Sequence, residues 1–150
     1  MSRLNTLIHY LLIFFLLQPI DTVASSLPRI SLQISHHKFS AEVANTQHSR
    51  ERGLMFRGAL DENAGMLFVF PESAYYGMWM KNTMIPLSVA FIDENGFIIN
   101  IADMQPYSLK AHYSSRPAKY VLEMSVGWFS SREIDAGSQI VGLERVPAAH

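Results

Sequence analysis

The chain has 150 residues and a mass of 17.0 kDa, a length that accommodates one compact domain. Its 12 Lys and Arg residues are balanced by 13 Asp and Glu residues, and the formal net charge of −1 argues against a basic nucleic-acid-binding surface. The absence of Cys excludes disulfides, thiolate metal sites, thiol nucleophiles and lipidated cysteines.

The N-terminal segment has the features of a secretory signal peptide. Residues 1–24 begin with a positive charge at Arg3, continue as an apolar run from Tyr10 to Leu17 and end in small residues around Ala24. The apolar run is shorter than the roughly 20 residues that span a bilayer, so we expect cleavage near Ala24. We therefore predict a periplasmic or secreted protein whose mature chain, residues 25–150, is a single domain without a membrane span and with its core at about 30–143.

Hydrophobic patterning predicts a β-rich beginning of the mature chain. Alternating apolar and polar residues at 30–34 and 38–43 indicate a hairpin with one buried face. Asn45 or Thr46 can then cap a short helix that runs to about Phe56. Residues 65–70 form a continuous apolar run, which is typical of a central strand buried on both faces.

The second half of the chain is also predicted to be rich in strands. Two β-rich runs at 87–92 and 97–102 flank the turn sequence Asp-Glu-Asn-Gly at 93–96, which favours a tight hairpin. Residues 103–117, with two Pro and two Tyr, indicate a long surface loop. A core strand at 119–124, a short helix at 126–134 and a last strand at 139–143 complete the prediction. The expected fold is a small β-rich α+β domain, barrel-like or with a strongly curved sheet, with one or two short helices.

Several motifs, in this order, resemble the domain-of-unknown-function family 192 of bacteria and archaea. They are R-G-L-M-F-R at 52–57, G-M-L-F-V-F at 65–70, W-M-K-N-T with I-P-L at 79–87, A-F-I-D-E-N-G at 90–96 and Y-V-L-E at 120–123. The resemblance covers about residues 30–141 and implies a small, frequently exported α+β domain without an established activity.

The chain departs from the family pattern at two positions. Ser88 stands where the family usually carries Asp, and Met78 stands where an aromatic residue is usual. If the family uses that carboxylate, this chain either lacks the activity or compensates with Asp93 or Glu94.

Residues 78–83 concentrate side chains that are suited to ligand binding. In an extended strand, Trp79, Lys81 and Thr83 would share one face, and an aromatic ring beside a cation and a hydroxyl suits a carbohydrate or a small anion. Asn82 adds an amide group. In the alternative interpretation these residues are structural, with the ring of Trp79 in the core and Asn82 in a turn.

Other candidate groups lie outside this segment. Arg52 and Arg57 could bind a carboxylate or a phosphate, or could instead pair with nearby acidic residues. Glu123, on a predicted strand, could be a buried, paired acid with a perturbed pKa. Asp93 opens the predicted hairpin turn, where Asp often bonds the local backbone.

Metal and cofactor binding are not expected. The thioethers of Met78, Met80 and Met84 are the best candidates for a Cu(I) site, but Met more often fills gaps in a core.

These features predict non-catalytic binding of a small polar ligand or carbohydrate in the cell envelope. The candidate ligand-binding residues are Trp79, Lys81, Asn82, Thr83, Arg52, Arg57, Asp93 and Glu123. One alternative is a protein-interaction module that docks an envelope protein through Tyr75-Tyr76 and the 103–117 loop. A second is a hydrolase acting on envelope polymers, although the sequence contains no recognisable nucleophile or metal-binding motif.

Overall fold

The computed structural model describes residues 26–150, so the predicted signal peptide lies outside the described residues. Seven strands form the main sheet: β1 (Arg29–Ile34), β2 (His37–Ala44), β3 (Ala64–Ala74), β5 (Leu87–Ile92), β6 (Ile98–Met104), β8 (Ala118–Ser125) and β9 (Ile140–Val141). Strands β4 (Gly77–Met78) and β7 (His112–Tyr113) form a second, two-stranded sheet. The helical elements are α1 (Gln47–Arg52) and the short 3₁₀ helices η1 (Ser130–Arg132) and η2 (Leu143–Arg145).

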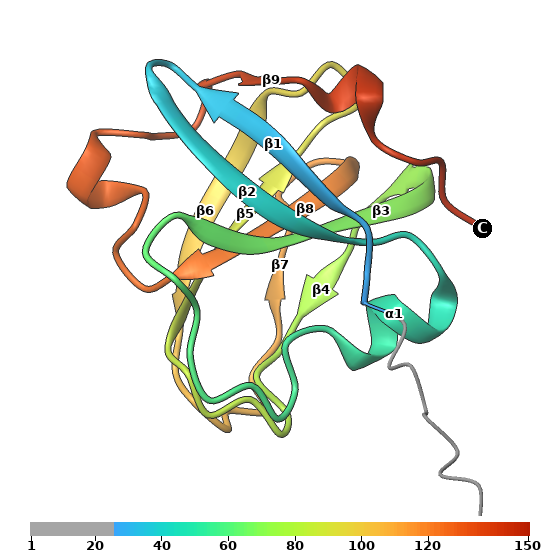
Figure 1. Ribbon diagram of the computed structural model, residues 1–150. Coiled ribbons are helices and arrows are strands. Elements are labelled where there is room, and N and C mark those ends of the chain that lie inside the picture. Colours follow the sequence, from blue (N-terminus) through green and yellow to red (C-terminus); the bar gives the residue numbers. More distant parts are fainter. Residues whose placement is uncertain (1–25) are drawn as a thin grey trace, which may run out of the picture.

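The main sheet curls into a half-barrel whose two edges meet (Figure 1). Its strand order is β6-β5-β8-β3-β2-β1-β9, and only the β2–β3 pair, which is connected through α1, is parallel. Gln139, next to β9, forms a β-bridge with Phe97, next to β6. The N–H of Ile98 donates to the carbonyl of Ser138 at 2.9 Å, which ties the two edges together. The predicted small β-rich domain with a curved sheet is confirmed.

Strand β3 is the middle strand of the main sheet and is buried on both faces, as its apolar run predicts. Leu67 and Val69 pack in the apolar cluster inside the half-barrel. Met66 and Phe68 pack on the outer face, in a second cluster with Met80 and other residues from the connections between strands. The connections therefore cover the outer face of the sheet, and the pocket described below lies beneath them.

The helix before β3 is shorter than the sequence suggests. Thr46, one of the two predicted caps, accepts a hydrogen bond from the N–H of Ser49 at 3.0 Å. The helix does not reach Phe56, because Gly53 ends it with a φ of +48°, a conformation that side-chain-bearing residues rarely adopt. A Cβ atom on Gly53 would also lie 3.2 Å from the ring of Phe68.

Residues 79–83 are not an extended strand, which corrects the prediction. Strand β4 ends at Met78, and a tight turn follows in which the N–H of Thr83 donates to the carbonyl of Met80 at 3.1 Å. Asn82 has a φ of +54°, which interrupts the alternation of side chains that a strand would impose. Trp79, Lys81 and Thr83 therefore do not share one strand face.

Four other elements differ from the prediction. Strand β6 extends to Met104. Strand β7 lies within the predicted 103–117 loop, where it pairs with β4. The predicted helix at 126–134 is reduced to a series of turns around η1, and the last strand contains only two residues. Among residues 26–150, no helix combines the length and apolar character needed to cross a membrane.

The β5–β6 hairpin forms as predicted and explains the environment of Ser88. Ser88 lies on the sheet face of Ala90, opposite to the face of the pocket, and its hydroxyl donates to a carboxylate oxygen of Asp103 at 2.5 Å. Asp103 is the cross-strand partner of Ser88 on β6. The carboxylate beside Ser88 therefore belongs to Asp103, whereas Asp93 bonds the backbone of its own turn.

We predict that Gly65→Ala destabilises the fold strongly. A Cβ atom at this position would lie 2.3 Å from both the carbonyl oxygen of Glu123 and the sulfur of Met124, so β3 and β8 would have to separate. We expect the free energy of unfolding, measured by denaturant titration, to fall by about 3 kcal/mol or more. Gly58→Ala is the matched control, because nothing lies within 4 Å of its Cβ; a similar loss in both variants would contradict this account.

Candidate ligand-binding site

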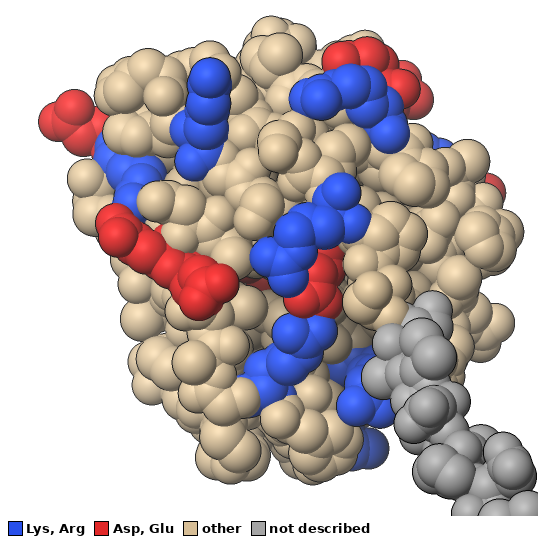
Figure 2. All heavy atoms as spheres, in the orientation of Figure 1, with Lys and Arg blue, Asp and Glu red and all other residues tan. Residues whose placement is uncertain are grey.

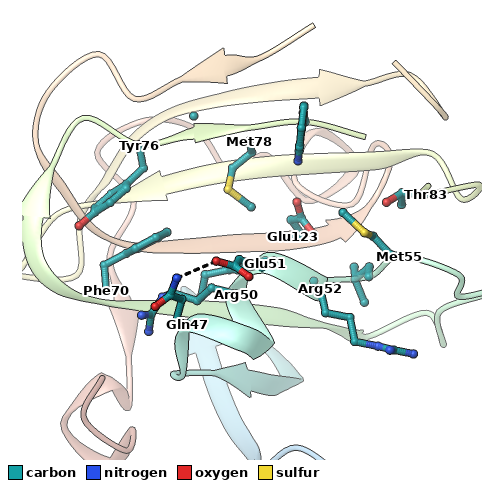
Figure 3. A pocket seen from close by; sticks show the side chains of 15 residues that line it. Gln47, Arg50, Glu51, Arg52, Met55, Phe70, Tyr76, Met78, Thr83 and Glu123 are labelled. Atoms are coloured by element: carbon teal, nitrogen blue, oxygen red, sulfur yellow. Dashed lines mark hydrogen bonds between the residues drawn. The ribbon is translucent and has the colours of Figure 1, made fainter. Parts of the chain in front are cut away.

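A pocket of about 390 Å³ lies on the outer face of the main sheet (Figure 3). Its floor is formed by Phe68 of β3 and Glu123 of β8, and α1 and residues 76–83 flank it. The other lining residues are Gln47, Arg50, Glu51, Arg52, Gly53, Leu54, Met55, Phe70, Tyr76, Gly77, Met78, Trp79 and Thr83. The volume is in the range that small-molecule sites occupy.

Glu123 is a buried carboxyl group that opens into this pocket. Its side chain is 3% exposed, and its neighbours in the sheet are the apolar residues Met66 and Val89. None of the hydrogen bonds or ion pairs among the described side chains involves its carboxyl oxygens, and Figure 3 shows it between Met78 and Met55. Burial raises the pKa of Glu123 to about 8. At neutral pH it is therefore mostly a carboxylic acid, which can donate one hydrogen bond and accept others.

Aromatic and thioether side chains form one wall of the pocket. The rings of Phe70 and Tyr76 are stacked with their centroids 3.5 Å apart, and the Tyr76 hydroxyl donates to the carbonyl of Glu72 at 2.8 Å. Trp79, directly after β4, is 47% exposed. The ammonium nitrogen of Lys81 lies over its ring, 5.4 Å from the ring centre. This wall offers flat apolar surface to a bound molecule.

Charged side chains of α1 form a neighbouring wall, in which the Arg50 guanidinium lies 5.7 Å from the centre of the Phe70 ring. Arg50 has a structural role, because its guanidinium donates hydrogen bonds to the backbone carbonyls of Asn45 at 2.7 Å and Val69 at 3.0 Å. Glu51 accepts a hydrogen bond from Gln47 at 2.9 Å, drawn as the dashed line in Figure 3. Arg52 makes no ion pair with the described residues and borders both this pocket and a neighbouring groove. Arg52 thus lies at the rim, and Figure 3 shows its side chain extending away from Glu123.

Arg57 has a different role from Arg52. Its two terminal nitrogens donate to the two carboxylate oxygens of Glu42 at 3.1 and 2.5 Å, and Arg29 binds the same carboxylate at 3.0 Å. Glu42 lies on β2, 15 residues away in the sequence. This bidentate arrangement fixes the chain after α1 to the main sheet.

The structure brings four of the eight predicted ligand-binding residues to the pocket: Arg52, Trp79, Thr83 and Glu123. Lys81 lies over the exposed ring of Trp79, whereas Asn82, Arg57 and Asp93 lie outside the lining. Asp93 accepts hydrogen bonds from the N–H groups of Asn95 at 2.9 Å and Phe97 at 3.0 Å, which is the local turn role that its position suggests.

The three candidate thioethers occupy different environments. Met78 lines the pocket, Met80 is buried in the outer apolar cluster, and Met84 is 45% exposed. Residues 26–150 contain no group of three or more His, Asp or Glu side chains placed to hold a metal ion.

Apart from Arg52, sequence reasoning missed the pocket residues on α1 and β3. The signal was present in the motifs, because R-G-L-M at 52–55, F-V-F at 68–70, W-M-K-N-T at 79–83 and Y-V-L-E at 120–123 each contribute lining residues. Segments that are distant in the sequence therefore converge on one cavity. Their spacing along the chain does not show this convergence.

Residues 30–142 match the pattern of the domain-of-unknown-function family 192, which is described as "Uncharacterized ACR". The chain belongs to this family. No curated protein matches it.

Two solved structures resemble this family-192 chain closely. One is a protein of Sinorhizobium meliloti 1021 described as a candidate transcription regulator, with 33% identity, a TM-score of 0.76 and coverage of 78% of this chain and 95% of its own. The other is a protein of unknown function from Novosphingobium aromaticivorans DSM 12444, with 29% identity, a TM-score of 0.76 and coverage of 80% and 89%. In both relatives the matched domain makes up nearly the whole solved chain, so in those two proteins it folds without a further domain.

We predict that Glu123 makes stability depend on pH. The folded state keeps this proton up to a pKa of about 8, whereas the unfolded chain releases it near 4.5. The contribution of Glu123 to the free energy of unfolding should therefore be fully present below pH 4.5 and be lost as the pH rises to about 8, by as much as about 5 kcal/mol.

Glu123→Gln isolates this contribution, because the amide has the same size but does not titrate. Denaturant titrations between pH 4.5 and 9 should show the variant gaining stability relative to the original protein as the pH rises. Parallel pH profiles for the two proteins would contradict the assignment of a buried, protonated Glu123.

Proposed function

We propose that this protein binds a small polar ligand with an apolar face, such as a carbohydrate, in the pocket beneath α1. The site of action is the cell envelope or the exterior of the cell, a location supported by the apolar run and small residues of segment 1–24. Binding without chemical turnover accounts for the lining residues, most of which are apolar or already engaged in hydrogen bonds within the fold.

The observation that carries this proposal is the unpaired carboxyl of Glu123 on the pocket floor. The residue is 3% exposed, and its unpaired oxygens keep access to the pocket, because none of the described side-chain oxygens is both fully buried and without a partner. A ligand hydroxyl could therefore form the hydrogen bonds that the protein itself does not supply to this carboxyl. Because Glu123 is mostly protonated at neutral pH, it can both donate to and accept from a hydroxyl group. A sugar or another polyol supplies groups of this kind.

The walls of the pocket support the same ligand chemistry. Trp79 lines the pocket and is 47% exposed, and aromatic rings stack on the apolar faces of sugars. Arg52 at the rim could add a contact to a carboxylate or phosphate substituent. Trp79 and Glu123 line the same pocket, which supports their binding one ligand.

The description of the S. meliloti relative suggests a role in transcription, but charge favours a small ligand for this chain. The net charge is −1, and Figure 2 shows acidic and basic side chains interspersed on the face of β1 and β2. Nucleic-acid binding generally relies on a concentrated basic surface. The only α-helix among residues 26–150 has six residues.

A thermal-shift screen of residues 26–150 tests the proposal. The probes are glucose, galactose, N-acetylglucosamine, and the disaccharide of N-acetylglucosamine and N-acetylmuramic acid. A ligand at a hundredfold excess over its dissociation constant stabilises the folded state by about 2.7 kcal/mol, which raises the melting temperature by about 10 °C. We expect a shift of this order with at least one probe.

Trp79→Ala should abolish the shift, because it removes the stacking surface at the mouth. Phe97→Ala is the matched control, since Phe97 is similarly exposed but lies outside the pocket. If no probe raises the melting temperature, or if both variants lose the shift equally, carbohydrate binding in this pocket is refuted.

The pH dependence of binding separates ligand classes. A ligand that accepts a hydrogen bond from the protonated Glu123 carboxyl should bind with constant affinity below pH 8. Above pH 8 its affinity should fall about tenfold for each pH unit. A cationic ligand should bind more tightly as the pH rises toward 8, which would contradict the uncharged polyol. In Glu123→Gln either dependence should disappear.

A further inference from the structure

Three loops meet at one end of the molecule, at the bottom of Figure 1. We call residues 55–58, 79–84 and 105–110 the loop tip. Backbone hydrogen bonds join its parts: the N–H of Phe56 donates to the carbonyl of Asn82 at 2.9 Å, and that of Tyr107 to the carbonyl of Thr83 at 3.0 Å. The N–H of Met80 donates to the carbonyl of Ser108 at 2.9 Å. The loop tip is thus one connected surface.

Large apolar side chains are concentrated on this surface. Five of them, each 45–66% exposed, belong to the loop tip: Phe56, Trp79, Met84, Tyr107 and Leu109. Exposed apolar residues are ordinarily scattered over a soluble protein, and a contiguous group marks an interaction surface.

Three residues of the loop tip have backbone conformations with positive φ angles. Phe56 and Tyr107 have φ values of +63° and +61°, which are rare for bulky residues. Asn82, to which Phe56 is bonded, also has a positive φ of +54°. Such conformations cost roughly 1–3 kcal/mol each and tend to occur where function requires them.

The charge of the loop tip has one sign. It carries Arg57, Lys81 and Lys110, and none of its residues is Asp or Glu. Arg57 is ion-paired with Glu42, whereas Lys81 beside Trp79 and Lys110 beside Leu109 make no ion pair with the described residues. On the visible lower part of this face, Figure 2 likewise shows basic but not acidic side chains.

We propose that the loop tip docks on a membrane surface that contains anionic lipid. Trp79 and Tyr107 are the residue types that favour the interface between water and hydrocarbon. Phe56, Met84 and Leu109 supply the apolar contacts. Lys81 and Lys110 lie close to them, where they would meet lipid phosphates.

Lipid explains the composition of the loop tip better than a protein partner does. Protein interfaces are depleted of Lys, whereas each Lys near an anionic bilayer strengthens binding about fivefold. Insertion of exposed Leu, Met and Phe side chains adds an apolar contribution that does not depend on a matching partner shape. The anionic surface complements both the charge and the apolar character of the loop tip.

Vesicle binding by residues 26–150 tests this proposal, with Trp79 as the reporter. The chain has two Trp residues, and Trp128 is buried, with its indole N–H bonded to Asn63 at 3.1 Å. Vesicles of phosphatidylglycerol mixed with phosphatidylcholine should shift the Trp79 emission to shorter wavelength and should sediment the protein. Pure phosphatidylcholine vesicles should bind at least tenfold more weakly, and raised salt should weaken binding to the mixed vesicles.

Two pairs of variants locate the contact. Met84→Ser with Leu109→Ser should reduce partitioning about tenfold or more, whereas Val126→Ser with Val141→Ser, comparably exposed but outside the loop tip, should leave it unchanged. Lys81→Ala with Lys110→Ala should weaken binding about 25-fold, and Lys38→Ala on β2 should not. Circular dichroism checks that each variant is folded.

Several outcomes would overturn the proposal. They are failure to bind mixed vesicles, equal losses in the loop-tip and control variants, and self-association or binding of a protein partner through the loop tip without vesicle binding. The pocket proposal is tested separately, because neither Met84 nor Leu109 lines the pocket. Loss of vesicle binding with an intact carbohydrate shift would leave the pocket proposal standing.

Discussion

The close contact between β3 and β8 is the constraint on which both the fold and the pocket depend. Gly65 allows the backbone of β3 to approach the Glu123 carbonyl and the Met124 side chain more closely than any Cβ atom would permit. On the inner face this pairing unites the apolar cluster of the half-barrel. On the outer face it places Phe68 and Glu123 together as the floor of the pocket.

The cost of burying Glu123 is best understood as a requirement of function. Its sheet neighbours Met66, Val89 and Val121 are apolar, and an apolar residue at 123 would extend that cluster without a desolvation penalty. Folded proteins retain such local conflicts mainly where a site needs them. The geometry adds to this argument, because the carboxyl faces a cavity bounded by α1 and residues 76–83.

Local patterns predicted the elements that local forces determine. The first hairpin, the β5–β6 hairpin and the doubly buried β3 follow from periodicity and turn chemistry, and the burial of Glu123 follows from its place on a core strand. The turn at 79–83 could not be predicted in this way, because its alternating residues resemble a strand while bonds from Phe56 and Tyr107 hold it. The same limit applies to the ion pair between Arg57 and Glu42, which depends on how α1 returns to the main sheet.

Trp79 connects the two proposed activities, since it belongs both to the pocket wall and to the loop tip. Its backbone lies between β4, which is paired with β7, and the turn anchored by the buried side chain of Met80. A surface bound at the loop tip would therefore lie next to the pocket mouth. This proximity favours ligands displayed at or near a membrane, because docking there would raise their effective concentration at Glu123 without requiring any change in the pocket itself.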